Sequence, residues 1–268
     1  MKLLSAFLYP VKSMRAVQVS AFTLDALGVV GDRRWMVVDL ENKFITQRDV
    51  PALISIQPAL LENGLALDDG ASTLKLQLPP LTAQRRRVTI WKDSFDALDA
   101  GDEAAHWLST RIATPCRLVA FASDVKRTVD TTWAENAQTG FTDAYPLLIV
   151  NEASLDLLNE KLSAPIPMNR FRPNLVVRGA AAWDEDRWTK LRIDGLAFDG
   201  VKPCARCVAI TRDQTSGVQP QGSEPLSVLA QLNTQTLKTG SKGAMFGMNL
   251  VHRGTGRITV GADVDVLS

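Results

Sequence analysis

Two cysteines three residues apart, Cys204 and Cys207, are candidates for a reactive centre, and Arg206 lies between them. A guanidinium beside a thiol favours the thiolate, which attacks electrophiles or binds a metal. A thioredoxin-like redox pair would open a helix, whereas residues 208–210 predict a strand. A zinc site needs further ligands, and the remaining cysteine and histidines follow no recognised spacing. From the residues alone, inert core thiols and a single metal ligand stay equally open.

Basic side chains at several separate places are candidates for an anion pocket. Arginine binds phosphate through paired hydrogen bonds, and lysine binds it as a point charge. Each residue alone is more typical of a solvated surface charge, and the sequence does not bring them together. The candidates, with two neutral neighbours, are Lys12, Ser13, Arg33, Arg170, Arg172, Asn174 and Arg206.

Asp143 is a carboxylate that could work beside such a centre, although capping of a turn is the slightly favoured alternative. It follows a polar, irregular stretch over residues 122–142, which is typical of a domain junction or a long loop. His106 and His252 have no carboxylate at a motif spacing, so a histidine-based triad finds no support. No dinucleotide-binding fingerprint or P-loop is present.

The numbers of basic and acidic residues are almost equal. Thirty basic residues against 29 acidic ones give a net charge of +1. Composition therefore gives no electrostatic reason to expect a nucleic-acid polymer or an anionic membrane as a partner. An odd number of cysteines without a secretory signal predicts a reducing compartment, so we expect a cytoplasmic protein.

Short strands separated by turn residues are the main pattern along the chain, and they predict an antiparallel barrel or sandwich. We expect helices over residues 102–112, from Glu152 after an Asn151 cap, and after Ser223 with Pro225 in the first turn. The fold class is mostly β with a few helices (α+β). Strands are predicted over residues 2–9, 15–24, 33–39, 44–46, 54–56, 65–67, 74–78, 87–91, 118–121, 146–150, 171–177, 191–193, 196–198, 208–210, 246–252 and 257–260.

Several short motifs occur in one order along almost the whole chain. In that order the chain resembles MOSC-domain proteins that carry an N-terminal MOSC β-barrel domain, and it is similar to the mitochondrial amidoxime reducing component and its bacterial homologues. The resemblance implies two β-barrel-like domains, which we place at residues 1–120 and 121–268. The motifs are Tyr9-Pro-Val-Lys-Ser13, Gly31-Asp-Arg-Arg-Trp35, Asn151-Glu-Ala-Ser154, Phe171-Arg-Pro-Asn174, Cys204-Ala-Arg-Cys207, Phe246-Gly247 and the stretch from Gly256 to Asp263.

The resemblance also implies a cofactor and its ligands. In that family the second cysteine of the Cys-x-Arg-Cys motif ligates the molybdenum of a pterin cofactor, which corresponds to Cys207. A soft thiolate suits such a metal. The family's aspartate near the metal corresponds to Asp143. The pterin phosphate is expected at Lys12, Ser13 and Arg33, and further cofactor contacts are expected at Arg172, Asn174 and Arg206.

The expected activity is the reduction of small N-hydroxylated compounds at molybdenum. The sequence departs from the family at Ala205, where relatives often carry a hydroxyl, and at Asn249, where an aromatic residue can stand.

No ferredoxin-type cysteine cluster follows Cys207, so electrons are expected from a separate ferredoxin, flavoprotein or haem protein. Two alternatives remain: a sulfur or molybdenum-cofactor carrier that uses the two thiols without turnover, and a non-catalytic module that binds another phosphate ligand.

Overall fold

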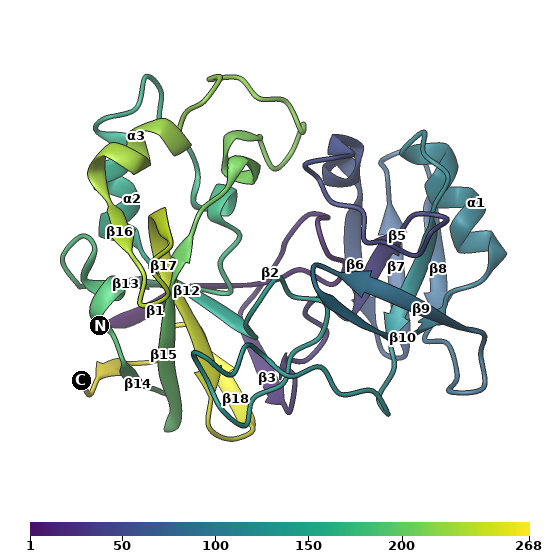
Figure 1. Cartoon of the computed structure of the whole chain (residues 1–268), viewed down its shortest axis with the longest axis horizontal. Helices are drawn as coiled ribbons and strands as arrows, with labels where there is room; N and C mark the ends of the chain where they lie inside the picture. Colours follow the sequence, from purple (N-terminus) through teal and green to yellow (C-terminus); the bar gives the residue numbers. More distant parts are fainter.

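The computed structural model describes residues 1–268 and consists of two β-rich halves side by side (Figure 1). The predicted mostly β fold with a few helices is confirmed. The helices are α1 (Asp102–Arg111), α2 (Glu152–Asn159) and α3 (Leu226–Leu232), with 3₁₀ turns η1 (Pro51–Ser55), η2 (Met168–Phe171), η3 (Asp184–Arg187) and η4 (Val208–Thr211). None of the helices is long and apolar enough to span a membrane.

The half that contains both termini is built on a nine-stranded sheet (Figure 1). Its order is β19-β14-β15-β17-β12-β13-β1-β2, with β16 paired to β17, and only β12 and β13 are parallel neighbours. A small sheet, β18-β3-β4, adjoins it. The strands are β1 (Lys2–Leu8), β2 (Val17–Val19), β3 (Ala21–Asp25), β4 (Gly28–Val29), β12 (Leu147–Asn151), β13 (Leu175–Arg178), β14 (Lys190–Ile193), β15 (Leu196–Ala205), β16 (Thr234–Thr236), β17 (Lys242–His252), β18 (Gly256–Thr259) and β19 (Val264–Val266).

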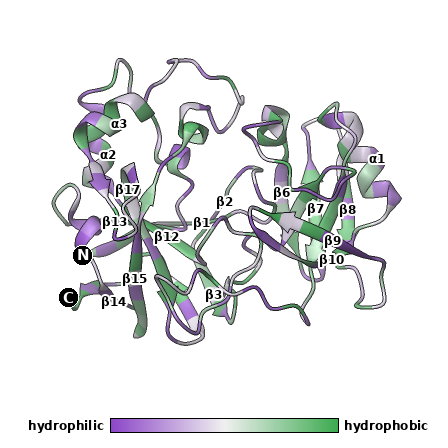
Figure 2. Ribbon diagram, viewed as in Figure 1, coloured by the Kyte–Doolittle hydropathy of each residue, from purple (hydrophilic) through white to green (hydrophobic).

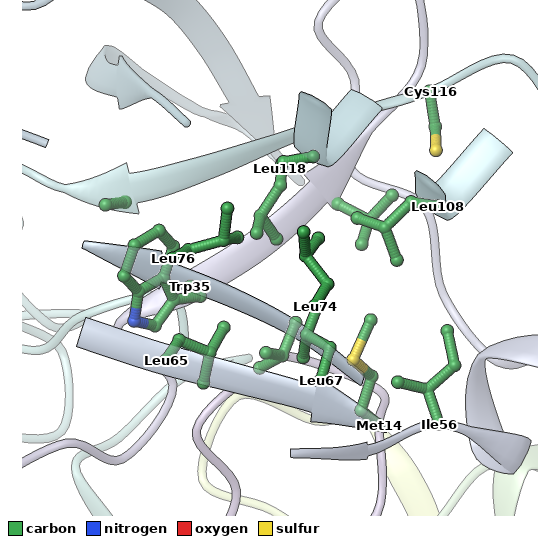
Figure 3. Close-up of a cluster of buried hydrophobic side chains, with 14 of the residues drawn as sticks. Met14, Trp35, Ile56, Leu65, Leu67, Leu74, Leu76, Leu108, Cys116 and Leu118 are labelled. Atoms are coloured by element: carbon green, nitrogen blue, oxygen red, sulfur yellow. The ribbon is translucent and has the colours of Figure 1, made fainter. Parts of the chain in front are cut away.

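The other half contains two antiparallel sheets, β5-β11-β10-β9 and β6-β7-β8, and α1 packs against β11. Its core is apolar because inward-facing residues alternate along these strands, as Leu74 and Leu76 do on β8 (Figure 3). Hydrophobic residues recur along the strands of both halves (Figure 2). The strands are β5 (Trp35–Val38), β6 (Gln57–Leu61), β7 (Gly64–Asp68), β8 (Thr73–Gln77), β9 (Arg85–Ile90), β10 (Asp93–Asp99) and β11 (Arg117–Phe121).

The first strands of the chain belong to the sheet of the C-terminal half. β1 pairs with β13, and β3 pairs with β18. The hydrogen-bonded sheets therefore do not follow a division at residue 120, and that domain boundary stays a prediction. The consequence for the site is that the chain leaves β1 and enters the region between the halves at Lys12 and Ser13.

Several predicted elements are wrong in detail. Residues 54–56 end the η1 turn instead of forming a strand, because Pro51 starts a 3₁₀ turn. At residues 44–46 only Phe44 makes an isolated bridge. The predicted strand over 15–24 is split at Ser20 into β2 and β3, which pair with different sheets. The sequence pattern did not predict β4, β6, β10, β16 or β19.

The first residues of the three helices agree only in part with the predicted N-termini. α2 begins as expected, since the Asn151 side chain accepts a hydrogen bond from Ala153 N. α1 has Gly101 as its N-cap, with Asp102 as the first helical residue. α3 has Pro225 at its N-cap and begins only at Leu226, so the prediction that the helix follows Ser223 directly, with Pro225 in its first turn, is wrong.

Candidate functional site

A cavity of about 270 Å³ lies where segments of both halves meet, and all eight predicted site residues line it. Residues 46–48 come from the half without the termini, and β15 with the residues that follow it comes from the other half. The structure thus brings together predicted site residues that are up to 195 positions apart (12 to 207). The predicted residues on its wall are Lys12, Ser13, Arg33, Asp143, Arg172, Asn174, Arg206 and Cys207.

Cys207 is an exposed thiol that lies just beyond the end of β15. The predicted strand over 208–210 is wrong: these residues form η4, which is closed by a 2.7 Å bond from Thr211 Oγ1 to Val208 O. Arg170 does not line the cavity. Its guanidinium donates to Thr211 O at 2.9 Å, so Arg170 stabilises η4 from outside the cavity.

Arg206 is directed at the other cysteine. Its Nη1 donates to Cys204 Sγ at 3.0 Å, and its Nη2 donates to Phe171 O at 2.8 Å. The Nε of Arg206 is buried and has no hydrogen-bond partner. Arg206 therefore donates a hydrogen bond to Cys204 and not to Cys207. The thiol of Cys207 is exposed and accessible to a ligand.

Two arginines of the site stack on one buried tyrosine. The guanidinium carbons of Arg33 and Arg172 lie 4.4 and 4.3 Å from the centre of the Tyr9 ring. The ring is held in turn by its hydroxyl, which donates to Pro173 O at 3.1 Å. Burial raises the pKa of Tyr9 to about 12, so the hydroxyl remains protonated. Tyr9 is a positioning residue that sequence reasoning quoted in a motif but gave no role.

The two stacked arginines differ in their charge balance. Arg33 donates to Asp32 at 2.5 Å and to Asn174 Oδ1 at 3.1 Å. Burial opposes its charge, but the charge and hydrogen bond of Asp32, together with other nearby groups, outweigh burial and raise the pKa of Arg33. Arg172 donates to the neutral amide of Gln214 at 3.0 Å, and burial lowers the pKa of its guanidinium to about 10. Arg172 therefore carries a charge that no carboxylate contacts.

Backbone strain is concentrated at these positions. Ser13, Arg33 and Arg172 have φ values of 71°, 46° and 53°, in the left-handed region that non-glycine residues seldom adopt. Each such residue costs about 1–3 kcal/mol and is stable only where the surroundings enforce it. Three strained residues on one cavity wall are typical of a site whose geometry is fixed before a ligand binds.

Lys12 and Asp143 form an ion pair on the wall. Lys12 Nζ donates to Asp143 Oδ1 at 2.6 Å and to Phe141 O at 3.0 Å. The lysine side chain is 6% exposed, whereas that of Asp143 is 71% exposed because it faces the open cavity. Burial lowers the pKa of Lys12. The position of Asp143 inside the cavity would raise its pKa, but the charge and hydrogen bond of Lys12, together with the charges of Arg33 and Arg48, outweigh this effect and hold that pKa well below its usual range.

Sequence reasoning missed the wall that residues 46–48 supply, and it predicted a strand for 44–46. Trp91, at the turn between β9 and β10, donates to Asp143 Oδ1 at 3.2 Å, and its ring lies 4.8 Å from the Arg48 guanidinium carbon. Asn249, one of the noted departures, also lines the cavity and donates to Lys202 O at 2.9 Å. No spacing signal in the sequence pointed to Gln47, Arg48 or Trp91.

The charge of the wall is strongly positive. Only one carboxylate, Asp143, lines the cavity. No three His, Cys, Asp or Glu side chains gather where they could hold a metal ion by themselves. The arrangement can therefore bind an anion and present one thiol to it. The six cations are Lys12, Arg33, Arg48, Arg172, Lys202 and Arg206.

Two family models match the chain: the MOSC N-terminal beta barrel domain at residues 1–115 and the MOSC domain at residues 136–265. The chain is similar to mitochondrial amidoxime-reducing component 1 of Xenopus laevis, with 32% identity over 96% of this chain and 79% of that protein. The Homo sapiens protein of the same name is 31% identical over 97% of this chain and 81% of that protein.

A molybdenum cofactor sulfurase of Oryza sativa subsp. japonica is also similar, with 31% identity over 84% of this chain but only 30% of that protein. The matched domains and the extent of these similarities agree with the predicted resemblance. The chain belongs to the family of MOSC-domain proteins that carry a MOSC N-terminal β-barrel domain.

Proposed function

We propose that this chain binds a molybdenum–pterin cofactor in the basic cavity and uses it to reduce N-hydroxylated compounds. The observation that carries the proposal is the composition of the wall: six cations and one carboxylate surround the exposed thiol of Cys207. Similarity to proteins named as amidoxime-reducing components supports the reaction class, and similarity to a molybdenum cofactor sulfurase supports the cofactor.

The unpaired donors of the cavity fit a phosphate-bearing group. Arg172 has only a neutral partner, and the buried Nε of Arg206 has none. Desolvated donors of this kind are costly when they stay unpaired, and an anion that accepts from them removes the cost. Lys12, Ser13 and Arg33 would bind the phosphate, and Arg172 and Arg206 would bind the rest of the cofactor. Asn174 would act mainly through Arg33, because its oxygen already accepts from that side chain.

Cys207 would be the one protein ligand of the metal. A soft thiolate suits molybdenum, and the absence of any cluster of three potential ligands means that a cofactor must supply the others. When bound, this cofactor supplies a two-electron redox centre. Reduction of an N–OH group consumes two electrons and two protons, and it releases water and the N–H compound.

Asp143 would orient the substrate. Its carboxylate faces the cavity, and Lys12 holds its pKa so low that it stays ionised at neutral pH. An ionised carboxylate accepts a hydrogen bond from the substrate N–OH group and is a poor proton donor. Electrons would come from a separate ferredoxin, flavoprotein or haem protein, and a cytoplasmic location remains a prediction.

A sulfur or cofactor carrier is the second candidate function. Cys204 and Cys207 both line the cavity, which a carrier that uses thiols without turnover also requires. The two functions differ in retention of the cofactor, since an enzyme keeps it through purification and a carrier exchanges it with an acceptor protein.

The test is expression in a strain that makes the molybdenum cofactor, followed by metal and pterin analysis. We expect molybdenum and pterin in the native protein, loss of the metal in Cys207→Ser, and retention in the matched variant Cys204→Ser. The native protein should reduce benzamidoxime with dithionite-reduced viologen as donor. Native protein without molybdenum and pterin contradicts the proposed enzyme, and metal loss in Cys204→Ser alone contradicts the ligand assignment.

A further inference from the structure

Gln47 is a residue of the cavity wall that none of the roles above uses. It is only 4% exposed, it lines the cavity, and its Oε1 is buried without a hydrogen-bond partner. Almost all buried polar groups in proteins are hydrogen-bonded, and an unpaired one costs about 1–3 kcal/mol. A buried acceptor that lacks a partner in the wall of a binding cavity indicates that a ligand supplies the donor.

The turn that carries Gln47 is rigid. Thr46 Oγ1 donates to Asp49 Oδ2 at 2.8 Å, and the backbone N–H groups of Asp49 and Val50 donate to Thr46 O at 3.0 and 2.9 Å. Ile45 N also donates to Val37 O at 2.9 Å, which ties the turn to β5. Because the backbone is fixed on both sides of Gln47, its unpaired oxygen cannot be explained by a loose segment.

Two side-chain acceptors of the cavity are already in use, whereas the second oxygen of Asp143, to which no protein group donates, stays open for the N–OH group. Asp143 Oδ1 accepts from Lys12 and Trp91, and Asn174 Oδ1 accepts from Arg33 and from a backbone N–H. The wall is otherwise rich in donors, with six cationic side chains. A neutral substrate that carries an N–H group therefore finds an unused acceptor at Gln47.

We propose that Gln47 is a specificity-determining residue that accepts a hydrogen bond from the amino group of amidoxime-type substrates. In these compounds an amino group and the N–OH nitrogen share one carbon, so the two polar groups point to neighbouring parts of the wall. Gln47 binds the amino group while Asp143 accepts from the N–OH group. This role rests on the proposed function, and it assigns part of the selectivity to the half that contains β5.

The experiment compares two substrates that differ by that amino group. Benzamidoxime carries it, and benzaldoxime has a hydrogen in its place. In the native protein loaded with cofactor, we expect benzamidoxime to be favoured about tenfold in kcat/KM, which corresponds to about 1.4 kcal/mol. Gln47→Met keeps the side-chain volume but removes the acceptor, and it should abolish this preference while molybdenum and pterin contents stay at the native level.

Binding supplies a second readout without turnover. The Kd of each oxime for the oxidised, cofactor-loaded protein is measured by calorimetry, and the preference should vanish in Gln47→Met here too. Gln57→Met is the matched control, because this half-buried amide lies outside the cavity and bonds to Ala16 O and Pro58 O. It should leave both Kd values unchanged.

Three results would overturn the role of Gln47. The first is an unchanged preference for benzamidoxime in Gln47→Met, and the second is an equal loss of kcat/KM for both oximes. The third is a loss of cofactor from Gln47→Met, which would mean that the amide contacts the pterin and not the substrate. Failure of the proposed function is a different result, in which the native, cofactor-loaded protein reduces neither oxime.

Discussion

Lys12 and Asp143 are 131 positions apart in the sequence, yet Lys12 Nζ lies 2.6 Å from Asp143 Oδ1. The pair is asymmetric, since the lysine is buried and the carboxylate faces the cavity. Asp143→Ala leaves a buried ammonium with only Phe141 O as acceptor, so we expect a loss of about 2–3 kcal/mol in the free energy of unfolding. Lys12→Met leaves a carboxylate that solvent hydrates, and the loss should stay below about 1 kcal/mol.

Urea denaturation of both variants at pH 7 checks this order. The double variant measures the coupling between the two side chains. Equal losses in the single variants, or a larger loss in Lys12→Met, would show that the lysine is not the buried partner that depends on the pair.

The stack of Arg33 and Arg172 on Tyr9 leads to a second prediction. Tyr9→Leu removes the ring on which both guanidinium groups lie, and such contacts are worth up to about 2 kcal/mol each where they are desolvated. Tyr9→Phe keeps the ring and loses only the hydroxyl bond to Pro173 O, which costs about 1 kcal/mol. We therefore expect Tyr9→Leu to purify with much less pterin than the native protein, and Tyr9→Phe to purify with nearly the native amount.

Pterin content is measured by fluorescence after release from the protein. Thermal unfolding of the same samples separates a folding defect from a binding defect. If Tyr9→Phe loses as much pterin as Tyr9→Leu, the hydroxyl and not the stacked ring positions the arginines.

Part of the site could be predicted from the sequence because most of its residues lie in short motifs. Each of the eight predicted residues lines the cavity, although no pattern of spacing or charge could place residues 12, 143 and 207 together. The local chemistry of Asn151 was sufficient to predict the start of α2, since a cap acts on its own helix. The same local reasoning failed at 208–210, where β-branched residues favoured a strand and η4 formed instead.

The residues that sequence reasoning missed are those whose role depends on tertiary contacts. Gln47 looks like an ordinary polar residue until the fold buries it without a partner. Trp91 looks like the end of a strand, but it occupies a turn with φ of 53° and reaches Asp143. Burial and pairing between distant segments are set by packing, which the periodicity of a single sequence does not encode.

Asn174 leads to a third prediction, about positioning. It is 1% exposed, its Oδ1 accepts from Arg33 Nη1 and Leu148 N, and its Nδ2 donates to Phe7 O. Asn174→Ala leaves these groups unpaired, so we expect a loss of about 2–4 kcal/mol in the free energy of unfolding. Chemical denaturation measures it, with Asn63→Ala in the exposed turn between β6 and β7 as the control. A loss below about 0.5 kcal/mol, which is the scatter of surface substitutions, would contradict the role.

Glu185 gives a prediction of pH dependence. It is fully buried in η3, its Oε2 accepts from Ser154 Oγ at 2.8 Å, and burial raises its pKa from 4.5 to about 7. Between these two values the folded protein binds a proton that the unfolded chain has released, so stability falls as pH rises through this window and levels off above it. Glu185→Gln cannot ionise and should avoid this loss. Its free energy of unfolding relative to the native protein should therefore rise by up to about 3 kcal/mol from pH 4.5 to pH 7.

Urea denaturation at several pH values across this window, and at pH 8, measures the difference between the two proteins. Glu152→Gln is the matched control, because Glu152 bonds to Arg178 and this contact lowers the pKa of its carboxyl. For that group the folded state holds its proton less tightly than the unfolded chain, so its contribution is present above pH 4.5 and lost in acid. The Glu152→Gln difference should thus stay flat between pH 5 and pH 8. A flat difference for Glu185→Gln over the same range would mean that Glu185 ionises in the folded protein as it does in the unfolded chain.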